Sequence, residues 1–173
     1  GITNDGNNNS FNLANRVLLG KLLFNCEAVT PIEITNVINF VRGRDVYWEG
    51  TRTKNDPKPS ILGDTFHSEI VLVGTPNDPV SGSAPKTSEA YYRSQKSYAS
   101  FVSTHQDRRK QFYVGANDGM LHAFDEDLNE RWAFIPPSLL NKLRNMTGTT
   151  GLSPGQGKTN SSYFVDGPIS VKD

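Results

Sequence analysis

The hydrophobic and polar positions of residues 111–136 alternate in a way that predicts three short β-strands joined by two tight turns. The first turn is Asn117-Asp118-Gly119, where Asp-Gly tolerates the positive φ of a two-residue hairpin. The second is the polar stretch 125–127, and the run Glu130–Ile135 predicts the third strand. A meander of this size buries too little surface to be stable alone, so we expect it to pack against sister sheets.

The rest of the chain predicts helices before the meander and one further strand. Apolar spacing predicts a helix over Phe11–Phe24 and a second from Pro31 that ends at Gly43. The continuous apolar run in Glu69–Val73 predicts a strand buried on both faces. Aromatic spacing in Ala90–Thr104 predicts a helical insertion. A return to a strand is expected at 163–165, a short helix at 138–144, and long loops at 46–60, 75–90 and 145–161.

These elements predict a mainly β fold, in which the meander is one blade of an incomplete β-propeller. Blades of antiparallel strands are expected to follow a short helical lead-in and to carry loop and helix insertions. We divide the chain into a partly helical lead-in, residues 1–43, and a partial propeller, residues 44–173, that stops in mid-pattern. Its 173 residues suffice for about one domain.

Charge and composition exclude some partners. The chain has 18 Lys and Arg against 18 Asp and Glu, so its net charge attracts neither nucleic acid nor anionic lipid over long distances. No run of about 18 apolar residues predicts a membrane span. Cys26 is the single cysteine, which leaves no internal disulfide and no paired-cysteine metal spacing.

Three short motifs suggest ligand chemistry, but each lacks a required feature. Gly155–Thr159 resembles the end of a phosphate-binding loop, but the first glycine is misplaced and no helix is expected to follow. Asp125–Pro136 begins like a calcium loop, but Glu130 occupies its glycine position and Pro136 its final glutamate position. The histidines lack metal-ligand spacing, so structural roles are expected for His67, His105 and His122.

The meander also resembles known sequences. Tyr113–Asp125 followed by Trp132 resembles the repeat of quinoprotein-type propellers. The longer sequence, VGANDGMLHAFD followed by ERWAFIPPSLLNKL, resembles the β-propeller region of PilC/PilY-type type IV pilus biogenesis proteins. Three further segments resemble the same family in the same order: Asn36–Asp45, Leu62–Val73 and Tyr163–Asp173. The positions that carry the blade motif are Gly115, Asp118, Gly119, Leu121, Ala123, Asp125 and Trp132.

The resemblance implies a non-enzymatic protein of the bacterial surface, pilus tip, outer membrane or periplasm. Its propeller would support pilus assembly, oppose retraction and mediate adhesion, with minor pilins and host-cell or surface ligands as partners. Calcium is implied for the parent protein, but no residue here matches the family's calcium loop, so no metal, cofactor or catalytic residue is assigned. Trp132 is expected to be buried between neighbouring blades.

Two alternatives remain open at this point. The same blade repeat occurs in dehydrogenases that use pyrroloquinoline quinone with calcium, although this chain lacks the adjacent cysteine pair that such enzymes often show. An outer-membrane assembly scaffold of the propeller type is the other alternative. Fold alone does not separate these functions.

Overall fold

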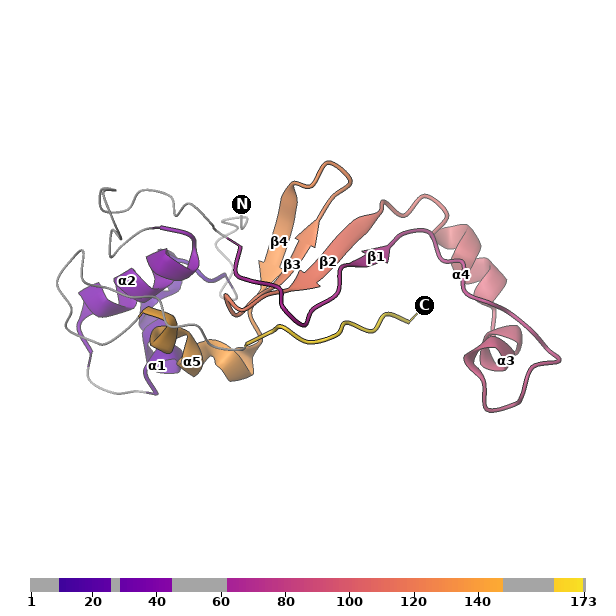
Figure 1. The fold of residues 1–173 in the computed structure, drawn as a ribbon, viewed down its shortest axis with the longest axis horizontal. Helices are drawn as coiled ribbons and strands as arrows, with labels where there is room; N and C mark the ends of the chain where they lie inside the picture. The colour runs from indigo at the N-terminus through magenta and orange to yellow at the C-terminus, as the bar shows by residue number, and fades with distance from the viewer. Residues whose placement is uncertain (1–9, 26–28, 45–61, 148–163, 173) are drawn as a thin grey trace.

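The computed structural model describes residues 10–25, 29–44, 62–147 and 164–172, which form one sheet with helices at both of its ends (Figure 1). The elements, in chain order, are the 3-10 helix η1 (Leu13–Asn15), α1 (Arg16–Leu23), α2 (Pro31–Val41), β1 (Val71–Val73), α3 (Glu89–Ser94), α4 (Tyr98–Thr104), β2 (Gln111–Gly115), β3 (Leu121–Phe124), β4 (Glu130–Phe134), the 3-10 helix η2 (Pro137–Leu139), α5 (Leu140–Leu143) and the 3-10 helix η3 (Arg144–Thr147). None of these helices is long and apolar enough to cross a membrane.

The two lead-in helices form where the sequence predicts them. A capping box starts α2: the Thr30 hydroxyl accepts from the backbone N–H of Glu33, and the Glu33 carboxylate accepts from the backbone N–H of Thr30. Pro31 sits in the first turn, where its missing N–H costs nothing. Just beyond the end of the helix, Gly43 has a φ of 84°, the left-handed conformation that favours glycine.

One hydrophobic core joins the lead-in to the segment that follows the sheet. Helix α1 packs against α2 and α5, and α2 also contacts η3. Figure 1 shows these helices gathered at one end of the sheet. The buried core residues are Phe11, Leu19, Leu23, Phe24, Val37, Ile38, Phe40, Val41, Met120, Leu143 and Met146. Met120 closes the turn between β2 and β3, so this core also holds one end of the meander.

The predicted three-strand meander is present, and β1 extends it to a four-stranded antiparallel sheet in the order β1-β2-β3-β4. The prediction of a two-residue turn is wrong, because the turn has three residues. Ala116 and Met120 close it, with the Ala116 N–H donating to the Met120 carbonyl at 3.0 Å. Among residues 117–119 only Gly119 has a positive φ, of 90°. This is the glycine position of a three-residue hairpin loop.

A strand was expected at Glu69–Val73, and its burial on both faces stays a prediction. Strand β1 contains only the last three of these residues and forms one edge of the sheet. The side chains of Ile70 and Leu72 are exposed, at 70% and 53%. The apolar run therefore predicted a strand correctly. Among the described residues, no second layer packs over the exposed side chains of this edge strand.

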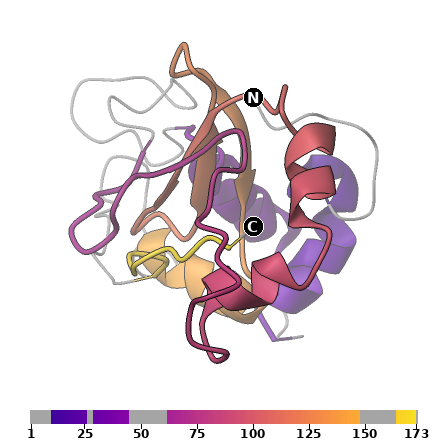
Figure 2. The ribbon, with the colours of Figure 1, turned by 90° about the vertical axis from the view of Figure 1, so that its right-hand side faces the viewer.

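A long insertion, residues 74–110, separates β1 from β2 and carries two short helices instead of one. Helix α3 ends at Ser94 and α4 begins at Tyr98, so the predicted helix over 90–104 is interrupted. Figure 1 and Figure 2 show the insertion extending from the end of the sheet opposite the lead-in helices. The predicted return to a strand at 163–165 is also wrong for the two of these residues that the structure describes, because Phe164 and Val165 have no strand conformation.

Candidate functional site: a polar junction of three chain segments

Three segments that lie far apart in the sequence meet at the turn between β2 and β3. We call this site the junction; it consists of residues 63–68, 115–122 and 164–166. Backbone groups of the turn bond to both neighbours, because the Asn117 N–H donates to the Asp64 carbonyl at 3.0 Å and the Val165 N–H donates to the Ala116 carbonyl at 3.4 Å. In Figure 1 the two neighbouring segments run past this end of the sheet.

Asp166 connects the last segment to the first. Its carboxylate accepts the backbone N–H groups of His67 and Ser68, with shortest distances of 2.8 Å to each, and its side chain is only 2% exposed. Burial by itself would raise the pKa of Asp166, but these hydrogen bonds outweigh it and leave the pKa below its ordinary value. The ionised carboxylate is therefore the form that closes the junction.

Asn117 links all three segments through one side chain. Its amide nitrogen donates to the carboxylates of Asp64, at 2.8 Å, and Asp166, at 3.2 Å. Its amide oxygen accepts the backbone N–H of Phe164 at 3.0 Å. Because Asp64 belongs to the first segment and Phe164 and Asp166 belong to the last, the Asn117 side chain fixes the position of the turn relative to both neighbours.

Gly115 allows the closest approach between two of the segments. Its N–H donates to the Ser68 hydroxyl at 2.9 Å. A Cβ built on Gly115 would overlap the carbonyl oxygen of Val165, so any larger residue would push the last segment away. The requirement for glycine comes from this contact and not from backbone strain, because Gly115 does not have a positive φ.

Asp118 extends the same function into the sheet. Its buried carboxylate accepts the backbone N–H groups of Gly63 at 2.9 Å and of Met120 at 3.1 Å. It also accepts from the Nε2 of His122 at 3.0 Å. Asp118 was predicted as a residue of the hairpin turn; its contact with Gly63, 55 residues earlier, adds a tertiary role, and its contact with His122 links the turn to β3.

His122 in β3 stands between two carboxylates. Its Nε2 faces Asp118, and its Nδ1 faces a Glu130 carboxylate oxygen in β4 at 2.7 Å. The ring side chain is only 4% exposed. Burial alone would lower the pKa of His122, but the hydrogen bonds and charges of Asp118 and Glu130 together outweigh it and raise the pKa above its ordinary value.

The chemistry of the junction is that of a structural connection. The Asp118 and Asp166 carboxylates each accept several hydrogen bonds from chain segments that they hold in place. Within the described ranges, no three or more His, Cys, Asp or Glu side chains gather to form a metal-binding group. The two carboxylates hold the backbone of neighbouring segments in position and so stabilise the end of the blade.

The predicted blade-motif positions fall into two sets. Gly115, Asp118, Gly119 and Leu121 lie in the junction. The other three lie in or beside the outer hairpin: Ala123, Asp125 and Trp132. The Asp125 carboxylate caps its own turn by accepting the N–H groups of residues 127 and 129. The Trp132 ring packs beside Tyr113, with ring centroids 5.6 Å apart, and is 39% exposed.

Sequence reasoning missed the partners that complete the junction. It did not identify Asn117 as a bridge, Asp166 as an acceptor, or Glu130 as a partner of His122. One signal was present, because the three stretches that meet at the junction all lie in segments that resemble the same family, and each carries Asp beside glycine: LGD, NDG and VDG. A shared tertiary contact is the physical reason for such residues to recur in separate segments.

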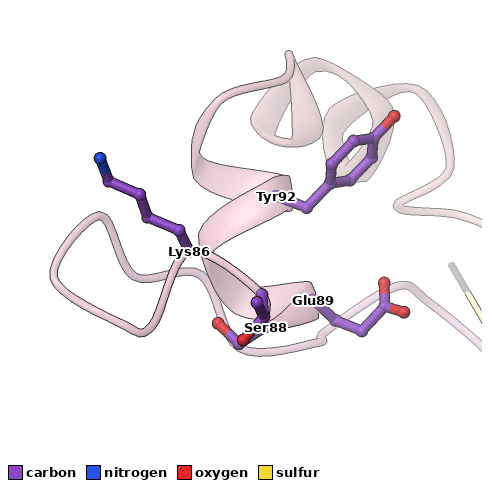
Figure 3. Close-up of a pocket in the computed structure, with 5 residues that line it drawn as sticks. Lys86, Ser88, Glu89 and Tyr92 are labelled. Carbon is purple, nitrogen blue, oxygen red and sulfur yellow. The ribbon is translucent and has the colours of Figure 1, made fainter.

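A second feature is a hollow of about 320 Å³ at the tip of the insertion, lined by Lys86, Thr87, Ser88, Glu89 and Tyr92 (Figure 3). The Tyr92 ring is 60% exposed, and the Lys96 ammonium lies 5.5 Å from its centroid. The Glu89 carboxylate is paired with Lys172 at 2.8 Å. The hydrogen bond lowers the pKa of Glu89, and the Lys172 charge adds to this effect. The hollow is therefore open, lined by both polar groups and an aromatic ring, and separate from the junction.

Comparison with known proteins identifies the family. The family model described as the PilY1 beta-propeller domain matches residues 62–173. The chain is 35% identical over 143 residues to the type IV pilus biogenesis factor PilY1 of Pseudomonas aeruginosa strain PAO1, covering 79% of this chain and 11% of that protein. It is 33% identical over 150 residues to PilY1 of strain PAK, covering 80% and 12%. A PilY1 homolog of Xylella fastidiosa is 32% identical over 137 residues, covering 79% and 10%.

These matches place the sheet within a larger architecture. The chain spans about a tenth of the length of these relatives, at 10–12%. No solved structure matches it. The match over residues 62–173 confirms the predicted β-propeller, in which β1–β4 form a four-stranded blade. The chain belongs to the PilY1 family and contains part of its β-propeller domain.

Proposed function

We propose that this chain is a non-catalytic part of a type IV pilus biogenesis factor of the bacterial cell envelope or surface. The observation that carries the proposal is the family match over residues 62–173, together with relatives named as pilus biogenesis factors. The junction fits this function, because its polar groups hold chain segments in place. The names of these relatives favour the pilus function over the quinone-dependent dehydrogenase and the assembly scaffold considered from the sequence.

Within this function, we assign a scaffold role to the blade and its junction and a binding role to the insertion. The blade and its junction supply rigidity, which a propeller needs to support assembly and oppose retraction at the pilus tip. The insertion supplies an exposed surface for adhesion to a host cell or another surface, since binding residues commonly lie on loops held by a rigid scaffold. Minor pilins are the proposed partners in assembly. Calcium, which the resemblance implies for the parent protein, is assigned to residues outside this chain.

Excision of the insertion tests this separation. Val73 and Gln111 are directly paired in β1 and β2, so residues 74–110 can be replaced by the two-residue turn Asn-Gly. A strain deleted for the parent gene is complemented with this shortened gene, and surface pili, twitching and adhesion are measured. We expect pili and twitching to be restored, because the blade and junction are intact, and adhesion to fall.

Asp118→Ala in the same parent gene is the matched variant, because it leaves the insertion intact and weakens the junction. We expect it to reduce pili, twitching and adhesion together. Wild-type pili and twitching in the deleted strain itself would overturn the proposed pilus function. Loss of pili on excision of the insertion alone would overturn the division of roles but leave the pilus function standing.

A further inference from the structure

The contacts of His122 couple the charge of one buried side chain to the outer hairpin of the blade. A neutral imidazole has one N–H donor and one bare nitrogen, whereas the imidazolium ion has two donors. Both ring nitrogens of His122 face carboxylate oxygens, Nδ1 toward Glu130 at 2.7 Å and Nε2 toward Asp118 at 3.0 Å. Both contacts are hydrogen bonds to ionised carboxylates only when the ring carries its second proton.

Among the residues that the structure describes, the remaining surroundings of His122 add no competing charge. The cross-strand neighbours of His122 are Val114 in β2 and Ala133 in β4, both apolar. The Phe124 ring stacks beside the imidazole with centroids 6.1 Å apart. The ionisable groups that act on the ring are Asp118, from the turn, and Glu130, from the outer strand. The charge state of His122 is therefore set by these two carboxylates and by burial.

The two carboxylates differ in how easily they can leave the ring. Asp118 is 8% exposed and is also held by the backbone N–H groups of Gly63 and Met120. Glu130 is 32% exposed, and water can solvate its carboxylate after a side-chain rotation. When the ring loses a proton, the remaining N–H stays with Asp118, and the bare nitrogen repels Glu130. Glu130 is the first residue of β4, beside an irregularity in its pairing with β3.

We propose that His122 is a proton-dependent clasp, which fastens the start of the outer strand β4 to the junction when protonated and releases it when deprotonated. The raised pKa sets the direction of the effect. A group whose pKa is higher in the folded state contributes stability that is fully present below its unfolded pKa and is lost as the pH rises through the folded pKa. The clasp is closed at acidic pH and opens as the medium becomes alkaline.

Hydrogen exchange in the full-length protein tests the clasp. Exchange is followed by mass spectrometry for peptides covering residues 120–134, from pH 5.5 to 9.5 (about four pH units spanning the ordinary His pKa), and corrected for the chemical exchange rate at each pH. We expect protection to fall by up to about tenfold per pH unit between the ordinary His pKa and the raised folded value, and then to level off. His122→Gln should give a profile without this step.

Two further variants distinguish an effect of His122 protonation from a general structural effect of its side chain. Glu130→Gln removes one of the charges that raise the pKa of His122, so the step should move to lower pH while the fold is kept. His105→Gln, at the residue that caps the end of the insertion's second helix, should leave the step unchanged. A step that persists in His122→Gln, or that does not move in Glu130→Gln, would overturn the proposal, and so would a flat wild-type profile.

Discussion

The two ends of this blade are stabilised in different ways. At the junction, hydrogen bonds connect residues 47 to 99 positions apart, as from Ser68 to Gly115 and from His67 to Asp166. At the other end, the insertion is held mainly by its own residues: Arg93 pairs with Asp78, and the Tyr98 hydroxyl accepts the Asp78 N–H at 3.1 Å. The junction ties two distant chain segments, 63–68 and 164–166, to the sheet, whereas the insertion is nearly self-contained.

The two ends of the blade should therefore differ in how well they tolerate substitutions. A substitution at the junction disturbs several chain segments at once, because each buried carboxylate serves more than one of them. A substitution in the insertion disturbs local contacts and leaves the strands paired. We therefore expect effects on stability to decrease from the junction to the insertion and to be smallest for the surface contact that links them.

Gly115→Ala should have the largest effect. The new Cβ would overlap the Val165 carbonyl, so the last segment must move and the hydrogen bonds of Phe164 and Asp166 are strained or lost. We expect a loss of about 3 kcal/mol in the free energy of unfolding, measured by urea denaturation. The control is Gly167→Ala, since a Cβ there meets nothing within 4 Å; its effect should stay within about 0.5 kcal/mol. Equal effects of the two substitutions would contradict the close approach.

Arg93→Met should have an intermediate effect, confined to the insertion. Arg93 is mostly buried, pairs with Asp78 and lies over the Tyr98 ring at 5.5 Å from its centroid. Because the Asp78 side chain is 40% exposed, its charge can be solvated, so we expect a loss of about 1–2 kcal/mol. Proteolysis should become faster within 74–110 and stay unchanged in the β2–β4 meander. Equal acceleration in both regions would show that the insertion is not independent.

Lys172→Ala should have the smallest effect. Lys172 pairs with Glu89 of the insertion at 2.8 Å, but both side chains are largely exposed, at 70% and 57%. Exposed ion pairs contribute little because water and salt screen them. We expect no measurable change in the urea midpoint in physiological salt. A clear loss of stability would mean that the two ends of the blade are coupled through this contact.

Trp132 shows how much of the side-chain packing can be predicted from the sequence. The sequence correctly placed this residue in the third strand of the meander, and its burial between neighbouring blades stays a prediction. In this chain its ring is 39% exposed and contacts Tyr113, because the described residues include one blade and no neighbour for that face. Pattern identifies which face of a strand is apolar, but only the surrounding structure determines what covers it.

The sequence by itself determined the local elements and the family. Alternation of apolar residues defined the meander, Pro31 and Gly43 marked a helix, and the wording around Asp118-Gly119 identified the propeller. These features depend on neighbouring residues, whose spacing and backbone preferences are written directly in the chain.

Only the tertiary structure decided which polar groups meet. Asp166, for example, finds two of its partners 98 and 99 residues away. The role of His122 likewise depends on a carboxylate from the turn and another from the next strand. Such contacts have no local period. They exist because folding buries donors and acceptors that must then find each other, and many residues separate them in the sequence.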